Sequence, residues 1–199
     1  MEHQRARRTI PGRIPLLLLL VTLGAAACSS GTPEERTSVL LNRGLEAHSA
    51  GRLDEAAGDY EAILKIDPQN QYALYNLGLI AQTNGDTVEA EQKYRLALAI
   101  DPNFTSPMFN LAILQTAAGD EEGAIELYRK VVKLDPKNAG AHLNLGLLLQ
   151  SIGKDKEGKV EIDKAIALDP ALKERLPSPS PSPKETTPRR TKSGSGRRS

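Results

Sequence analysis

The side chains that most often carry catalysis are scarce in this chain of 199 residues. It contains one cysteine, Cys28, and only His48 and His142 represent histidine beyond the N-terminal segment. A lone cysteine cannot form an intramolecular disulfide, and no nucleotide-binding loop or metal-ligand spacing is present in the sequence. We therefore predict that the protein is not an enzyme and binds neither a cofactor nor a metal. His142 is predicted to be a structural histidine with satisfied hydrogen bonds rather than a general base.

Amide side chains, by contrast, recur at a fixed spacing. Asparagines stand 34 residues apart, at Asn42, Asn76, Asn110 and Asn144. A carboxamide both donates and accepts hydrogen bonds, so four in a row could pair with successive peptide groups of an extended ligand. The alternative is that each asparagine bonds a neighbouring helix and only supports the fold.

The same period governs the elements that must hold these side chains. Asp-Pro pairs recur every 34 residues, with prolines at Pro68, Pro102, Pro136 and Pro170, and glycines keep the same spacing at Gly51, Gly85, Gly119 and Gly153. Apolar residues between these marks have helical spacing, which indicates two amphipathic helices per period. Glycine suits the left-handed C-cap that ends the first helix, and proline, which has no N–H to donate, ends the second. A fixed period of this length predicts an all-α solenoid.

The second period, residues 71–104, shows the packing pattern most fully. Its small, apolar, aromatic and turn residues are Leu74, Leu77, Gly78, Ala81, Ala90, Tyr94, Ala97 and Pro102. This pattern resembles the tetratricopeptide repeat (TPR) family, whose helix-turn-helix unit has the same length. The resemblance implies a right-handed superhelical solenoid of four TPR hairpins in a domain of residues 37–176. The repeats are expected at about residues 37–70, 71–104, 105–138 and 139–172, followed by a short cap.

Four residues depart from the family pattern. Arg43 and His142 replace apolar residues, and Ile63 and Val131 replace small ones. We expect these changes to loosen packing locally without breaking the period.

In the TPR family the concave groove is lined mainly by the first helix of each hairpin, so the resemblance implies a peptide-binding groove. The residues at the matching positions are Asn42, Tyr72, Tyr75, Asn76, Leu79, Gln82, Phe109, Asn110, Ile113, Asn144, Leu147 and Gln150. A similar asparagine ladder in the O-linked N-acetylglucosamine transferase holds peptide backbone. No cations occupy the positions with which chaperone-binding members clamp a C-terminal carboxylate. The resemblance therefore implies binding led by the peptide backbone.

The N-terminal segment has the layout of a secretory signal peptide over residues 1–27. Arginines precede an uncharged apolar stretch of residues 14–27, which is shorter than the roughly 20 residues that a spanning helix needs. The alanines before Cys28 and the cysteine itself resemble a bacterial lipobox. This implies cleavage before Cys28, lipid on its thiol, and a protein anchored on the extracytoplasmic side of the cell membrane by a short tether of residues 28–36. Because three alanines also suit ordinary signal peptidase, the alternative is a soluble secreted protein.

The C-terminal residues 177–199 change composition abruptly. Alternating proline and serine give way to six basic residues and one acidic residue, whereas residues 28–176 are net acidic. Such a segment has no apolar residues to bury, so we predict a disordered basic tail. The tail either solubilises the protein or attaches it to anionic envelope polymer or lipid. Nucleic acid is not an expected partner of an exported protein.

Together these features predict a membrane-anchored lipoprotein that acts as a scaffold or adaptor for other envelope or secreted proteins. One alternative is a soluble secreted TPR protein, or a structural protein attached to the envelope through its tail. Another is an auxiliary subunit of an envelope enzyme complex.

Overall fold

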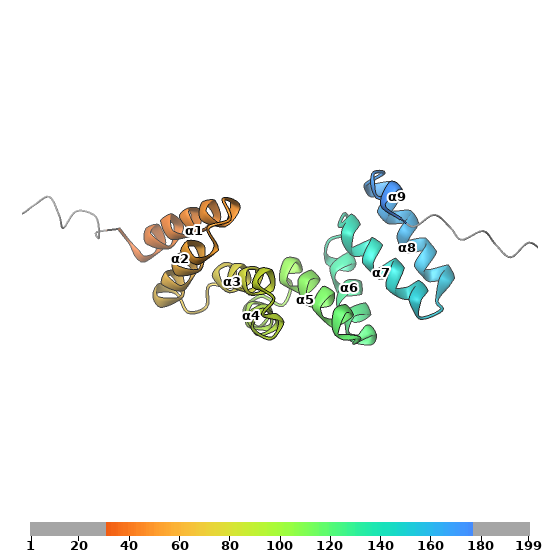
Figure 1. The fold of residues 1–199 in the computed structure, drawn as a ribbon, viewed down its shortest axis with the longest axis horizontal. Coiled ribbons are helices and arrows are strands. Elements are labelled where there is room, and N and C mark those ends of the chain that lie inside the picture. Colours follow the sequence, from red (N-terminus) through yellow and green to blue (C-terminus); the bar gives the residue numbers. More distant parts are fainter. Residues whose placement is uncertain (1–30, 177–199) are drawn as a thin grey trace, which may run out of the picture. The chain divides into compact units, whose positions relative to one another are not determined.

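The computed structural model describes residues 31–176, and all regular structure in this part of the chain is α-helical (Figure 1). The predicted signal peptide, Cys28 and the predicted tail of residues 177–199 lie outside the described residues. The described residues form two compact units, divided between Pro107 and Met108. Across residues 31–176, no helix has the length and apolar character that crossing a membrane requires.

The first unit contains two helical hairpins (Figure 1). Its helices are α1 (Pro33–Ser49), α2 (Leu53–Ile66), α3 (Gln71–Asn84) and α4 (Thr87–Ile100). Helix α1 packs against α2, α3 against α4, and α2 against α3. The small residues Ala47, Ala56 and Ala73 are fully buried beside the large side chains of Tyr60 and Ile63, so the helices approach closely.

The second unit contains most of α5 and the remaining helices. They are α5 (Thr105–Ala118), α6 (Glu121–Leu134), α7 (Ala139–Ser151), α8 (Asp155–Leu168) and α9 (Leu172–Arg175). Helix α6 packs against α7, and α7 against α8. The four-residue helix α9 lies where the sequence predicts a short cap, and its Leu172 is buried. The predicted all-α fold of helical hairpin repeats is confirmed.

The turn inside each hairpin is made by a glycine with left-handed backbone. Gly51, Gly85, Gly119 and Gly153 have φ between 75° and 87°. At the end of α3, the amide of Asp86 donates to the carbonyl of Ala81. The left-handed conformation of Gly85 thus gives a carbonyl group of the last helical turn a hydrogen-bond donor. The helix ends predicted at these glycines are confirmed.

The turn between hairpins depends on the Asp of each Asp-Pro pair. Asp67 ends α2, and its carboxylate accepts a hydrogen bond from the amide of Gln69 at 3.1 Å. The same side-chain bond recurs at Asp101, Asp135 and Asp169.

Asparagine caps the next helix in two of the repeats. Asn70 and Asn138 accept from the backbone N–H three residues later, at 3.0 and 2.9 Å.

The first helix is longer than the sequence predicts. Residues 33–36, assigned above to the tether, form the first turn of α1. The Thr32 side chain accepts from the amide of Glu35, and the Glu35 carboxylate accepts from the amide of Thr32, which together make a capping box. Pro33 suits the first helical position because its φ is already helical and the missing N–H has no partner there.

The departures from the family pattern are each accommodated. Ile63 and Val131 are fully buried in the place of small residues. Arg43 forms a two-point ion pair with Asp59 across the α1–α2 hairpin. His142 is buried, and both of its ring nitrogens have polar partners, so the prediction of a satisfied structural histidine is confirmed.

Candidate functional site

A groove of about 520 Å³ lies between helices α5, α6 and α7 of the second unit. Its lining residues are Ile113, Thr116, Ala117, Tyr128, Asn144, Leu147, Leu148 and Ser151. Three of them, Ile113, Asn144 and Leu147, belong to the predicted set. The volume lies in the range of ordinary ligand sites, which is roughly 300–1,000 Å³.

The apolar part of this groove combines buried and exposed side chains. Leu148 and Tyr128 are buried, Ile113 is half-buried, and Leu147 is 38% exposed. An exposed leucine beside a buried one offers apolar surface to a ligand without opening the core.

The polar part consists of groups that local hydrogen bonds hold in place. The Asn144 amide donates to the Tyr128 hydroxyl at 3.2 Å, and the Thr116 and Ser151 hydroxyls donate to carbonyl groups of their own helices. Burial raises the pKa of Tyr128 more than its hydrogen bonds with Thr116 and Asn144 lower it, so the phenol stays neutral at physiological pH. A carboxamide has two donor hydrogens and an acceptor oxygen, so the bond to Tyr128 uses only part of the capacity of Asn144.

In the first unit, the predicted residues form an aromatic cluster. The rings of Tyr72 and Tyr75 lie 5.5 and 5.3 Å from the ring of Phe104, and Tyr75 lies 6.0 Å from Tyr94. Tyr72 is 51% exposed. Aromatic rings at such distances attract one another, so these contacts hold the exposed Tyr72 ring against Phe104.

The asparagine ladder does not have one environment. Asn76 is buried, and its amide donates to the carbonyl of Tyr72 one turn earlier at 2.8 Å. Asn144 instead bonds Tyr128 of a neighbouring helix. Asn110 is half-buried and Asn42 is exposed. The alternative of a bond to a neighbouring helix therefore describes Asn144, which also lines the groove, whereas Asn76 bonds its own helix.

The other predicted residues have separate roles. Gln82 accepts a hydrogen bond from the Tyr94 hydroxyl at 2.7 Å, and the Phe109 ring lies 5.8 Å from that of Tyr128. Leu79 is half-buried and Gln150 is exposed.

The predicted set omits five lining residues, namely Thr116, Ala117, Tyr128, Leu148 and Ser151. Tyr128 lies on the second helix of its hairpin, where the sequence indicates only packing between helices. A buried phenol needs a hydrogen-bond partner, and that requirement could have placed its hydroxyl at the groove.

Within residues 31–176, no group of three or more His, Cys, Asp and Glu side chains is arranged to hold a metal ion. The groove itself has no charged lining residue.

Three solved structures with the same fold are similar to this one. Pseudomonas aeruginosa PilF has a TM-score of 0.63 and 24% identity, over 69% of this chain and 63% of that chain. The O-GlcNAc transferase of Thermobaculum terrenum has a TM-score of 0.56 and 28% identity, over 60% of this chain and only 23% of the transferase. The first TPR domain of Spaghetti (RPAP3), bound to the HSP90 peptide SRMEEVD, has a TM-score of 0.56 and 24% identity, over 59% of this chain and 94% of that domain.

Comparison with curated proteins gives no significant match, and the family is identified by family models. A family model described as a TPR repeat matches residues 115–153, and two described as tetratricopeptide repeats match residues 41–103 and 139–172. The matches to residues 41–103 and 139–172 cover the hairpins of α1–α4 and of α7–α8, and the match to residues 115–153 covers α6 and α7. The chain belongs to the tetratricopeptide repeat family.

Proposed function

We propose that this protein is an interaction scaffold that binds extended segments of other proteins in the groove of α5, α6 and α7. The observation that carries the proposal is the combination of an exposed apolar side chain, Leu147, with the anchored amide of Asn144 in one open groove. A TPR domain bound to a peptide, as in the RPAP3 structure, illustrates the class of ligand.

The chemistry of the groove defines what it should bind. An apolar ligand side chain would cover Ile113 and Leu147, while a peptide group would pair with the remaining donor and acceptor of Asn144. Because no lining residue is charged, affinity should depend little on salt or on acidic residues in the ligand.

A peptide-display selection on the full chain, followed by fluorescence anisotropy with the selected peptides, tests this proposal. Replacing Ile113 and Leu147 together by alanine should weaken binding at least about tenfold, because most of the apolar contact is lost. The matched control replaces Val160 and Leu168, two exposed apolar residues of α8 outside the groove, and should bind as the native chain does. Equal affinities for both variants would contradict the proposed site.

We further propose that the scaffold is an exported lipoprotein anchored through Cys28, on the sequence pattern that precedes this cysteine. Two or more acyl chains would hold the protein stably at a membrane, whereas one gives only marginal binding. The Cys28→Ser variant should lose incorporation of a fatty-acid analogue and move from the membrane fraction to the soluble fraction, whereas Ser29→Ala should do neither. A native chain that takes up no fatty acid would favour the soluble secreted alternative.

The basic tail defines a second means of attachment to the envelope. If residues 177–199 bind anionic polymer or lipid, deleting them should reduce salt-sensitive retention in the envelope fraction, since the tail is net basic whereas residues 28–176 are net acidic. Unchanged retention would leave the tail with a solubilising role.

A further inference from the structure

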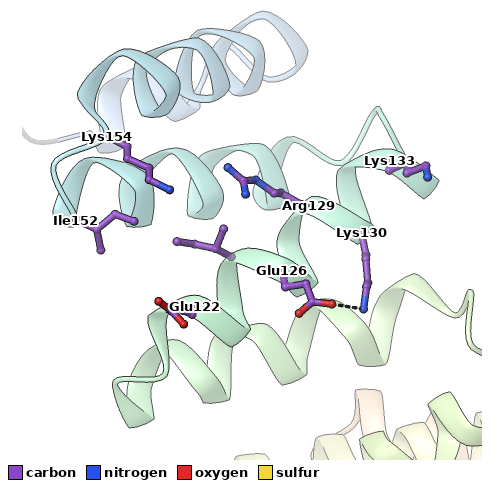
Figure 2. Close-up of a pocket in the computed structure, with 8 residues that line it drawn as sticks. Glu122, Glu126, Arg129, Lys130, Lys133, Ile152 and Lys154 are labelled. Carbon is purple, nitrogen blue, oxygen red and sulfur yellow. Dashed lines mark ion pairs between the residues drawn. The ribbon is translucent and has the colours of Figure 1, made fainter.

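A second pocket, of about 530 Å³, lies between α6 and the turn that joins α7 to α8 (Figure 2). Its lining residues are Glu122, Ile125, Glu126, Arg129, Lys130, Lys133, Ile152 and Lys154. The six residues from α6 recur at intervals of three or four positions. They therefore form one face of the helix over three turns. None of the eight lines the groove described above.

The pocket has an apolar centre and a cationic rim. Ile125 is 6% exposed and Ile152 is half-buried. Figure 2 shows Lys154 and Arg129 extending into the space between the turn and α6, and Lys133 at the C-terminal end of that helix. Four cations and two acids line the pocket, which gives it net positive charge in a domain that is net acidic.

The rim cations are only partly neutralised. Lys130 pairs with Glu126 at 2.7 Å and Arg129 with Glu157 at 3.1 Å. Both pairs are about half exposed or more, and exposed pairs are weak enough for a ligand carboxylate to replace the acid. Within residues 31–176, Lys133 and Lys154 form no ion pair, so their charges are available to a ligand.

We propose that this pocket binds an acidic peptide segment of a partner protein. An apolar side chain of the segment packs on Ile125 and Ile152, and its carboxylates pair with Lys133, Lys154 and Arg129. The scaffold therefore has two binding sites of different chemistry, an uncharged groove for extended peptide and a basic pocket for an acidic one. The second site does not depend on the first.

The test uses the full chain and a fluorescein-labelled peptide of sequence Glu-Glu-Leu-Glu-Glu, titrated by fluorescence anisotropy. The double variant Lys133→Gln, Lys154→Gln should bind about tenfold more weakly, because two charge pairs are lost. The matched control is Lys137→Gln, Lys173→Gln, which removes the same charge from exposed lysines outside the pocket and should keep the native affinity. The Ile113→Ala, Leu147→Ala groove variant should also keep it.

A second readout separates this pocket from the basic tail. The same peptide with a photoreactive leucine should crosslink to residues 122–133 or 152–154. Crosslinks confined to residues 177–199, equal weakening by the two lysine double variants, or equal binding of a Gln-Gln-Leu-Gln-Gln peptide would each overturn the proposal.

Discussion

Arg43 of α1 donates two hydrogen bonds to the buried carboxylate of Asp59 on α2, with Arg43 Nε 2.7 Å from Asp59 Oδ2. Arg43 occupies a position where the repeat family has an apolar residue, and Asp59 is 4% exposed. The two residues are therefore tolerated together, because the Asp59 carboxylate accepts the hydrogen bonds of Arg43 and balances its charge across the hairpin. The hydrogen bonds from Arg43 hold the pKa of Asp59 below its ordinary value, although burial acts against them.

The first prediction concerns this pair. Arg43→Leu should lower the midpoint of thermal unfolding at pH 7, because it leaves a buried carboxylate without its partner. Since the folded pKa of Asp59 is lowered, the stabilisation is complete above the unfolded pKa of about 4 and disappears as the pH falls through the folded pKa. Circular dichroism melts should therefore show a difference from the native chain that shrinks in acid. The double variant Arg43→Leu, Asp59→Leu should recover stability at pH 7, and no recovery would argue against a simple ion pair.

The second prediction concerns the polar partners of the buried His142. Its Nδ1 lies 2.6 Å from Glu161 Oε2 and its Nε2 3.2 Å from the carbonyl of Pro136, which can only accept. Burial acts to raise the pKa of Glu161, but hydrogen bonds from Lys164 and His142 outweigh it and the pKa is lowered. Glu161→Gln should therefore cost about 1–2 kcal/mol of unfolding free energy near pH 7. This cost should shrink as the pH falls below the unfolded pKa of about 4 and vanish below the lowered folded pKa.

Urea unfolding across this pH range measures the effect of Glu161→Gln. The matched control is Glu126→Gln, which removes an exposed carboxylate that pairs with Lys130 four residues later on the same helix. This control should leave the midpoint nearly unchanged at every pH. A similar loss in both variants would mean that burial beside His142 contributes nothing.

The third prediction contrasts two helical glycines. A Cβ on Gly78 would lie 2.6 Å from Cε1 and 2.7 Å from Cδ1 of the Tyr94 ring, whereas a Cβ on Gly58 would meet no heavy atom within 4 Å. Gly78→Ala should thus destabilise the chain by about 1–3 kcal/mol through overpacking. Gly58→Ala should stabilise α2 by about 0.5–1 kcal/mol, since alanine is the better helix former. Urea unfolding of both variants checks the order, and a stabilising Gly78→Ala would show that Tyr94 can move aside.

The fourth prediction contrasts two equivalent tyrosines. Tyr60 and Tyr94 are both fully buried, but only Tyr94 donates to a side chain, that of Gln82. Within residues 31–176, the Tyr60 hydroxyl has no hydrogen-bond partner. Tyr94→Phe should cost about 1 kcal/mol, while Tyr60→Phe should be neutral or stabilising because it removes an unsatisfied buried hydroxyl. Thermal melts of the two phenylalanine variants provide the comparison, and equal losses would contradict it.

Much of the local structure follows from residue types alone. Gly85 predicts the end of α3, because the left-handed backbone conformation there would be strained with a side chain. Asp67 before Pro68 predicts the end of α2. The start of α1 was predicted four residues too late. Thr32, Pro33 and Glu35 carry a capping signal that lies before the first repeat, so the period of the repeats does not include it.

The candidate site was predicted only in part. The period places Ile113, Asn144 and Leu147 on the first helices of their hairpins, and all three line the groove. It could not place Tyr128 there, because that hydroxyl reaches the groove through contact between α6 and α7. The basic pocket combines α6 with a turn some twenty residues later, and helical periodicity carries no information about that pairing.

Residue types and their spacing specify the repeat, its helices and the turns between them, because these depend on backbone preferences of single residues and on apolar spacing within one helix. Which polar groups meet depends instead on how the helices pack. Asn76 and Asn144 hold the same place in their repeats, yet one bonds its own helix and the other Tyr128, because hydrogen bonds form with whichever group the packing brings within reach.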